Sequence, residues 1–390
     1  MNELAKRVID RAIEIQQIPA PTFDESKRAE FVRGLFVNEG LKDISLDDVG
    51  NVYGLLSNVK GAALRPKEVS KGQTSNVKPL IISAHLDTVF PKETNLEVKR
   101  EGEKIFGPGL GDNSLGVAAL FGLMWMIHER NIQLGGDVWF VANVCEEGLG
   151  DLRGMKAIVD RFGADPSARL RQSGCGVLAY LVLEGLALGH IYHRAVGVKR
   201  FRVTARTKGG HSWSDYGQPS AVHEISKLVV QLSSLELPSH PRTTMNVGKI
   251  SGGTSVNVIA SEASFDLDLR SEGQESLAEL VSAAEKLIHH ANKPGVSFEA
   301  EVIGQRPAGE MDANHPLVKL AEDCLREQGL DAVLTSGSTD ANVPLSKGYP
   351  ALVLGVSTGG SAHTVHEFIH AAPVEQGMEQ LVSFVERVWN

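Results

Sequence analysis

The sequence predicts an α/β protein of two domains, one inserted into the other. In the first half of the chain and again near its end, short apolar runs alternate with segments of helical period, which is typical of a mainly parallel sheet covered by helices. Between these parts, the order strand, helix, strand, strand, helix, strand is that of a ferredoxin-like unit. The length of 390 residues also exceeds what one hydrophobic core usually supports.

Residues 1–194 and 306–390 are predicted to form the larger, mainly parallel domain. It begins with two amphipathic helices and a hairpin, followed by an exposed loop at residues 60–78. The helices are expected at Met1–Ile18 and Ser26–Asn38, closed by Gly40, and the hairpin at Asp47–Ser57 with its turn at Gly50. Further strands are expected at Pro79–Ala84, Asp137–Val144, Val177–Leu183, near Val333 and at Ala351–Gly355, and further helices at Leu115–His128, Leu152–Ile158, Pro316–Gln328 and Val374–Trp389.

Residues 195–305 are predicted to form the inserted domain. A length of about 110 residues is sufficient for an independent core. Its strands are expected at Val196–Thr207, Thr243–Ile250, Glu262–Arg270 and Val296–Ile303, and its helices at Pro219–Leu235 and Gln274–Ala291.

Charge and composition argue against a nucleic-acid-binding or membrane protein. The net charge of -9 and the pI near 5.8 give no basic surface for nucleic acid or anionic lipid. The longest apolar run, Leu115–Ile127, is shorter than the roughly 20 residues that span a bilayer. Met1–Ile18 lacks the continuous apolar core of a signal peptide. Three widely spaced cysteines do not suit a disulfide framework, so we expect a cytoplasmic protein.

A histidine and a carboxylate stand at the carboxyl end of the first central strand. His85 and Asp87 are two residues apart, so in an extended chain both side chains leave the same face. The carboxylate can fix the tautomer of the imidazole, as a metal-bound histidine requires. A buried histidine paired with a carboxylate, with no metal, is the ordinary alternative.

Four further segments place a carboxylate or an imidazole where a strand-like run ends. They contain Asp112 in a glycine-rich loop, the adjacent Glu146 and Glu147, Glu184, and His363. Two imidazoles and several carboxylates without a thiolate suit zinc or a related divalent ion. A pair of such ions needs a bridging carboxylate, for which Asp112 is the natural candidate. Because neighbours in an extended chain face opposite ways, one glutamate can bind metal while the other takes a proton from water.

As a set, these motifs resemble those of the co-catalytic dizinc metallopeptidase family that includes aminoacylase, carboxypeptidase G, acetylornithine deacetylase, succinyl-diaminopimelate desuccinylase and tripeptidase T. Singly, each segment has an ordinary explanation as a solvated turn or a loop; together and in order they favour one metal centre. The matching segments are His85-Leu-Asp87, Gly109-Leu-Gly-Asp112-Asn, Glu146-Glu147-Gly, Leu183-Glu184-Gly and Ala362-His363-Thr-Val-His-Glu367-Phe.

The resemblance implies two divalent metal ions per subunit, zinc in the first place, with cobalt and manganese as alternatives. The ions would share Asp112, with ligand sets His85, Asp112 and Glu184 on one ion and Asp112, Glu147 and His363 on the other.

The same resemblance assigns roles around the ligands. Glu146 would be the general acid/base, and Asp87 would orient His85. Family members have a cis peptide bond after the bridging aspartate, which here is the bond between Asp112 and Asn113.

The inserted domain resembles the family's lid and dimerisation domain, which implies a homodimer. Three of its residues, His211, Asn257 and Arg270, resemble positions that hold substrate. His211 would help to stabilise the oxyanion, in its own or in a partner's active site. Arg270 could bind a substrate carboxylate through two parallel hydrogen bonds, and a surface pairing with Asp268 or Glu272 is the alternative.

The predicted function is therefore hydrolysis of an amide bond in a small peptide or N-acyl amino acid, in the manner of a carboxypeptidase or deacylase, by metal-activated water. A tripeptidase or aminopeptidase-type metallopeptidase is the alternative, because Glu184 resembles the first group whereas Thr339–Val343 resembles the tripeptidases. Two other classes stay open: a non-catalytic binding protein on the same fold, and a dinuclear phosphoesterase.

Overall fold

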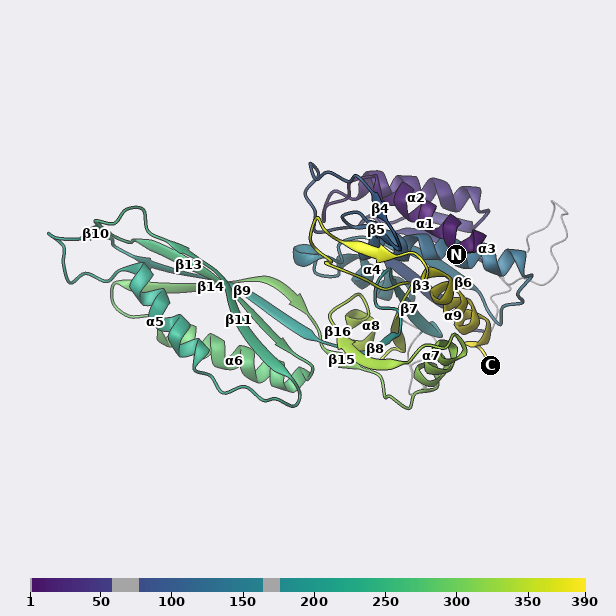
Figure 1. Ribbon diagram of the computed structural model, residues 1–390. Coiled ribbons are helices and arrows are strands. Elements are labelled where there is room, and N and C mark those ends of the chain that lie inside the picture. Colours follow the sequence, from purple (N-terminus) through teal and green to yellow (C-terminus); the bar gives the residue numbers. More distant parts are fainter. Residues whose placement is uncertain (1, 58–76, 164–175) are drawn as a thin grey trace. The chain divides into compact units, whose positions relative to one another are not determined.

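The computed structural model describes residues 2–57, 77–163 and 176–390 (Figure 1). The chain forms two compact units: unit 1 is Met1–His193 with Glu310–Asn390, and unit 2 is Arg194–Gly309. The sequence placed these boundaries after residues 194 and 305. Unit 2 runs further because its last strand, β14 (Val296–Arg306), continues past the predicted end at Ile303.

Unit 1 is built on a sheet whose four central strands are parallel. The described strands follow the order β1-β2-β6-β3-β7-β17-β8-β15, and β16 pairs with β8 (Figure 1). The central strands are β6 (Val138–Asn143), β3 (Leu80–His85), β7 (Ala179–Glu184) and β17 (Ala351–Gly355). Their apolar side chains are almost entirely buried, and their carboxyl ends meet at one edge of the sheet. The predicted mainly parallel α/β class is confirmed.

Further strands flank the central four on both sides, and the first of them on each side is antiparallel to its neighbour. They are β1 (Lys42–Leu46), β2 (Val52–Leu56), β8 (His190–Ala195), β15 (Gly309–Glu310) and β16 (Val333–Gly337). A second small sheet contains β4 (Lys99–Glu101), β5 (Lys104–Phe106), β18 (Gly359–Gly360) and β19 (Phe368–His370).

The predicted hairpin at Asp47–Ser57 began too late. Its first strand is β1, and Asp47 belongs to the turn, where its carboxylate accepts the backbone N–H groups of Val49, Gly50 and Asn51. Such Asx turns are a common use of aspartate. Most of the loop predicted at residues 60–78 lies outside the described residues.

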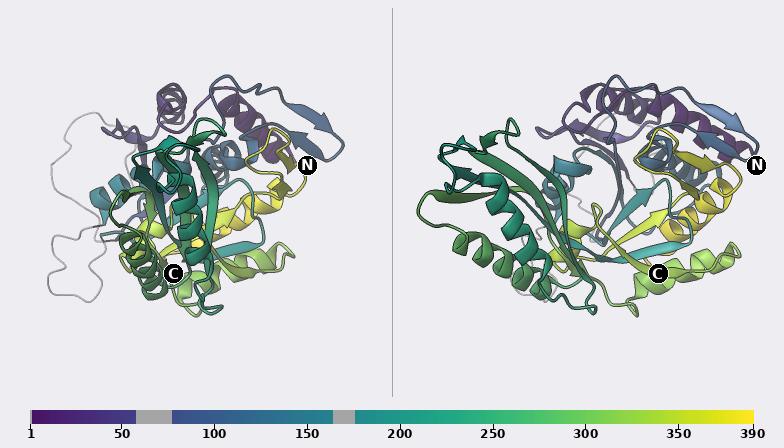
Figure 2. Two further views of the ribbon diagram at one scale, coloured as in Figure 1. Left: turned by 90° about the vertical axis from the view of Figure 1, so that its left-hand side faces the viewer. Right: turned by 60° about the vertical axis from the view of Figure 1, so that its left-hand side comes forward.

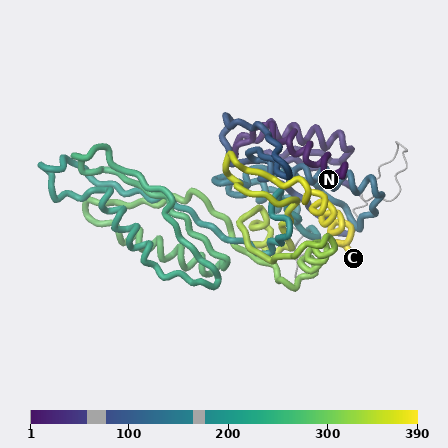
Figure 3. Tube along the Cα trace, in the orientation of Figure 1, coloured from purple at the N-terminus to yellow at the C-terminus, as the bar shows by residue number. Residues whose placement is uncertain are grey.

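One apolar helix, α3 (Leu115–Glu129), forms the centre of unit 1. It packs against β3 and β7 and contacts both α1 (Glu3–Gln16) and α9 (Val374–Arg387), so the two ends of the chain meet around it (Figure 3). The remaining helices of this unit are α2 (Ser26–Asn38), α4 (Arg153–Phe162), α7 (Pro316–Glu327), α8 (Asn342–Ser346) and the short turns η1 (Leu110–Ser114) and η2 (Gly148–Gly150).

The apolar stretch at α3 is longer than the sequence suggested, because η1 precedes the helix. Among the described residues, Leu110–Glu129 is the one helical segment long and apolar enough to cross a membrane. Within its apolar window 94% of the residues are buried inside the protein. A helix that is apolar on all sides and covered on all sides is a core helix.

Unit 2 has the predicted ferredoxin-like order. Its elements are β9 (Gly197–Thr207), α5 (Ala221–Ser233), β11 (Thr243–Gly252), β13 (Glu262–Ser271), α6 (Gln274–His290) and β14. The antiparallel sheet has the order β11-β13-β9-β14, and both helices pack on the same face of it (Figure 2). A two-stranded ribbon of β10 (Gly210–His211) and β12 (Val258–Ile259) extends from this unit.

Candidate active site

Five segments of unit 1 bring titratable side chains together at the carboxyl edge of the central sheet. His85 is the last residue of β3, Glu184 is the last residue of β7, and Glu146 and Glu147 follow β6. Asp112 lies in η1, and His363 comes from the loop between β18 and β19. Parallel strands place their carboxyl ends side by side at one edge of the sheet, so residues far apart in the sequence meet there.

The imidazole of His85 is buried and held from one side by the backbone. Its Nδ1 lies 3.0 Å from the carbonyl oxygen of Asp87. A donated Nδ1–H leaves the lone pair on Nε2, which lies 3.2 Å from Asp112 Oδ1 and 3.7 Å from Glu184 Oε2. Burial opposes the imidazolium, but Asp112 and the other carboxylates outweigh it and raise the pKa of His85.

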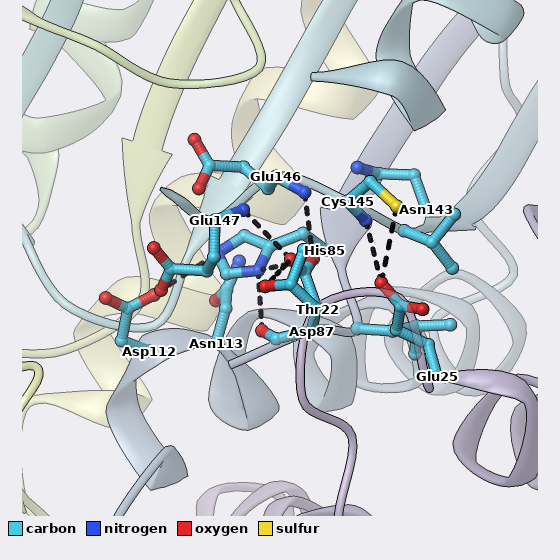
Figure 4. Close-up of polar contacts among 12 residues, drawn as sticks. Thr22, Glu25, His85, Asp87, Asp112, Asn113, Asn143, Cys145, Glu146 and Glu147 are labelled. Atoms are coloured by element: carbon cyan, nitrogen blue, oxygen red, sulfur yellow. Dashed lines mark hydrogen bonds and ion pairs between the residues drawn. The ribbon is translucent and has the colours of Figure 1, made fainter. Parts of the chain in front are cut away.

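The carboxylate of Asp87 is fully buried and serves the neighbouring turn. Its Oδ1 accepts the N–H of Glu146 and its Oδ2 the N–H of Glu147, both at 2.9 Å, and Thr22 Oγ1 donates to Oδ2 at 3.0 Å (Figure 4). The distance from Asp87 Oδ1 to His85 Nδ1 is longer, 3.6 Å. Asp87 therefore contacts His85 mainly through its backbone carbonyl, while its side chain fixes the turn that carries both glutamates.

Asp112 lies between the two histidines. Its Oδ1 faces His85, and its Oδ2 is 3.0 Å from Nε2 of His363. The Asp112–Asn113 peptide bond is cis, as the family resemblance implied. Burial opposes ionisation of Asp112, but the two imidazoles outweigh it and lower the pKa of the carboxyl group.

Glu147 and His363 complete the second side of this arrangement. Glu147 Oε1 lies 3.2 Å from His363 Nε2 and, within the described residues, accepts no hydrogen bond although it is buried. Asp112 and Glu147 together raise the pKa of His363 to about 10. The side chain of His363 is 55% exposed, so this face of the site is open to solvent within unit 1.

These donors fit two divalent ions. His85, Asp112 and Glu184 form one group of converging ligand atoms, and Asp112, Glu147 and His363 form another. Ligand atoms on a tetrahedron with bonds of about 2.0–2.2 Å lie roughly 3.3–3.6 Å apart. The observed separations of 3.0 to 3.7 Å are close to that range. The buried Glu147 oxygen without a hydrogen bond and the excess of carboxylates over imidazoles both suit bound cations.

Glu146 is buried beside these groups but points apart from Glu147. In Figure 4 the Glu147 carboxylate points toward Asp112, whereas the Glu146 carboxylate points in a different direction. A carboxylate oxygen of Glu146 still lies within 4.8 Å of ligand atoms of His85 and Glu147. The divergence expected for neighbours in an extended chain is thus present, with Glu147 on the ligand side.

Sequence comparison identifies the family. The pattern described as Peptidase family M20/M25/M40 matches residues 81–387. The chain belongs to this family. Among curated proteins, the uncharacterized protein YqjE of Bacillus subtilis is 25% identical over 398 residues, covering 98% of this chain and 96% of its own.

Solved structures share the fold over both units. A tripeptidase from Staphylococcus aureus superposes with a TM-score of 0.78 at 22% identity, covering 98% of each chain. The YXEP protein of Bacillus subtilis, described as a dinuclear metal binding peptidase from the M20 family, superposes with a TM-score of 0.63 at 16% identity, again over 98% of each chain. The protein is an M20 metallohydrolase of peptide or amide bonds, and the expected metallopeptidase or amidohydrolase class is confirmed.

Two carboxylates that support this M20 site had no assigned contact in the sequence. Glu25, just before α2, is buried, and its Oε1 accepts the N–H of Cys145 at 3.1 Å (Figure 4). Cys145 has a left-handed backbone, with φ of 59°, directly before Glu146. The only signal in the sequence was an acid at a helix start, which usually reflects capping alone.

Glu367 holds the loop of Asp112. Its fully buried carboxylate accepts three backbone N–H groups, from Gly109 at 3.1 Å, Gly111 at 2.7 Å and Asp112 at 2.9 Å. Burial raises the pKa of Glu367 to about 7 against the lowering effect of these donors. The sequence had marked Glu367 only by its spacing from His363.

Asn113 supports the strand that ends at Glu184. Its side-chain amide donates to the carbonyl of Leu183 at 2.8 Å and accepts the N–H of Gly185 at 2.8 Å. Asn113 therefore holds the residues on both sides of Glu184 in the chain.

The three residues predicted in the inserted domain lie on unit 2. His211 is exposed on β10, and its Nδ1 accepts the N–H of Trp213 at 3.2 Å. Asn257 is close to it, because its carbonyl accepts the N–H of the residue after His211 at 3.0 Å. Arg270 is separate on β13, and its Nε donates to Asp268 Oδ2 at 2.7 Å, which is the surface pairing considered as the alternative.

Proposed function

We propose that the protein hydrolyses an amide bond of a small peptide or N-acyl amino acid, with two divalent ions, zinc in the first place, and with Glu146 as general acid/base. One observation supports this most. Two groups of ligand atoms share Asp112, and the Glu146 carboxylate is buried within 4.8 Å of His85 and Glu147 without being needed in either group.

The roles of the side chains follow from their positions. Bound divalent ions would polarise the scissile carbonyl and lower the pKa of a water molecule. Glu146 accepts the proton of the attacking water and passes it to the nitrogen of the leaving amine, so that carboxylate and charge are restored after each cycle. Asp87 and Glu25 hold the turn that carries Glu146, and this keeps the base in place for both proton transfers.

The experiment compares two adjacent glutamates. Glu146→Gln should retain two metal ions per chain and lower kcat by about 10²–10⁴-fold, the usual contribution of general acid–base catalysis. Glu147→Gln should instead lose metal, measured by elemental analysis of the purified protein. An exposed control, Glu129→Gln, should change neither quantity, since Glu129 pairs with Arg7 at the surface. Unchanged turnover in Glu146→Gln would contradict the assignment.

A substrate panel separates the candidate functions. We propose N-acyl amino acids and dipeptides as the preferred class, and tripeptides as the alternative that the similarity to a tripeptidase supports. Each is assayed with zinc, cobalt and manganese. If no member of the panel is cleaved while two ions are bound, the catalytic proposal fails and a binding protein on this fold is favoured.

We also propose that unit 2 forms a homodimer. Among the described residues, β11 and β14 are the edge strands of its sheet. The N–H and C=O groups on the outer side of an edge strand can pair with a strand of a second chain. Sedimentation equilibrium of the full chain tests this, and a monomer at all concentrations would contradict it.

A further inference from the structure

An exposed arginine near the turn that carries the proposed general base has no polar partner among the described residues. Arg153, the first residue of α4, is exposed, and its Cζ lies 4.7 Å from the ring centroid of Phe23. Within the described parts of the chain it makes no hydrogen bond or ion pair, unlike Arg270, which is paired with Asp268. Phe23 is itself 55% exposed, and its backbone is left-handed, with a φ of 78°. The Arg153 guanidinium therefore stacks on an exposed aromatic ring, and its N–H groups can donate hydrogen bonds to a ligand.

Helix stability does not explain the position of Arg153. The N-terminus of a helix carries partial positive charge, so an arginine there is unfavourable. The first turn of α4 contains no acidic residue that would compensate. A residue whose charge conflicts with its position in a helix is a candidate for function.

Both members of the pair are tied to the turn that carries Glu146. On one side, Gly154, the residue after Arg153, donates its N–H to the carbonyl of Val144 at 3.2 Å. On the other side, Phe23 lies between Thr22 and Glu25 in the chain. Thr22 donates a hydrogen bond to Asp87, and Glu25 accepts one from Cys145.

We propose that Arg153, stacked on Phe23, binds a carboxylate of the substrate whose amide bond is cleaved beside Glu146. This inference rests on the proposed function and narrows its substrate class to anionic peptides or N-acyl amino acids. A guanidinium accepts a carboxylate through two parallel N–H···O bonds, and an aromatic ring that fixes its plane reduces the entropy lost on binding. The carboxylate can be the C-terminal group or an acidic side chain.

Four dipeptide substrates distinguish these sources. Ala-Ala is compared with its C-terminal amide, and Ala-Glu with Ala-Gln, in the metal-loaded full-length enzyme. The wild type should prefer the substrate with the relevant carboxylate, and R153Q should raise KM for that substrate by about 10–100-fold with little change in kcat, the usual effect of losing one charge-assisted pair. R153K should be intermediate, because a lysine lacks the planar fork.

The matched control is R161Q. Arg161 lies on the same helix, and its Cζ stacks 4.1 Å from the ring centroid of Tyr53, so R161Q removes another stacked arginine of α4 together with one hydrogen bond, to Ser45 Oγ at 3.2 Å. Equal kinetics for R153Q and R161Q, or an unchanged preference for the carboxylate in R153Q, would overturn the inference while leaving the hydrolase intact. Failure of the wild type to cleave any of the four dipeptides, while other members of the wider panel are cleaved, would also overturn the inference and leave the proposed function intact. Failure to cleave any member of that panel would refute both.

Discussion

Replacing Glu367 by glutamine tests whether one buried carboxylate organises the metal side of the site. Its Oε1 accepts the N–H groups of Gly111 and Asp112, and its Oε2 accepts that of Gly109. Glutamine has one acceptor oxygen, so it can keep the first two bonds but turns an NH₂ donor toward Gly109. An unpaired buried N–H costs about 1–3 kcal/mol, and each bond that loses its charge weakens by about 1 kcal/mol. These losses sum to about 3–5 kcal/mol, but glutamine also removes a carboxylate whose charge is disfavoured by burial, so the expected net loss in unfolding free energy is about 1–3 kcal/mol.

Two measurements follow the Glu367→Gln variant. Urea unfolding of the metal-free protein gives the stability change, and calorimetric titration with zinc gives the affinity of the two ions. We expect weaker binding, because Glu367 holds the Asp112 loop and lies four residues after His363. Glu327→Gln is the control, since Glu327 pairs with Arg387 at the surface and its loss should cost less than about 0.5 kcal/mol. A stability within about 1 kcal/mol of wild type together with unchanged zinc affinity would contradict this role of Glu367.

Two further predictions concern a glycine and a helix cap. In Gly116→Ala the new Cβ would lie 2.0 Å from Asn113 Oδ1, so the side chain beside Glu184 must shift; thermal unfolding should show a loss of about 1–3 kcal/mol, whereas Gly34→Ala, with nothing within 4 Å in α2, should gain up to about 1 kcal/mol. His315 caps α7 by accepting the N–H of Leu317, and burial lowers its pKa, so its contribution of about 1 kcal/mol is complete above pH 6.5 and is lost as the pH falls through the folded pKa. Unfolding measured from pH 7.5 to 5 should depend less on pH in His315→Asn, and an identical dependence would contradict this role.

The parallel core was predictable because its strands are continuous apolar runs that differ clearly from the helices between them. Leu80–His85 and Ala351–Gly355 are examples, and both strands lie within a residue of their predicted positions. The hairpin of β4 and β5 was missed. These strands have three residues each and several charges, and β5 is stabilised by pairing with β19, far along the chain. Local patterning carries no information on such a partner.

The candidate site shows the same division. Residues at strand ends could be recognised from sequence, because the parallel sheet places those ends together whatever the surrounding detail. The contacts of Glu25 with Cys145 and of Glu367 with Gly109 join residues 120 and 258 positions apart. Contacts between residues so far apart in the sequence leave no local pattern from which they could be predicted. Arg270 illustrates the opposite case, since its neighbour Asp268 was visible in the sequence and the pairing is the one found.

The position of β17 constrains the order in which the chain can fold. This strand lies between β7 and β8 in the sheet, yet it is synthesised after all of unit 2. Unit 2 is continuous in sequence and can close while the ribosome is still adding residues. Until Ala351–Gly355 emerges, β7 keeps an apolar edge unpaired, and such edges recruit other chains. Premature termination in the last part of the gene should therefore yield insoluble protein, with a folded unit 2 attached to an incomplete sheet.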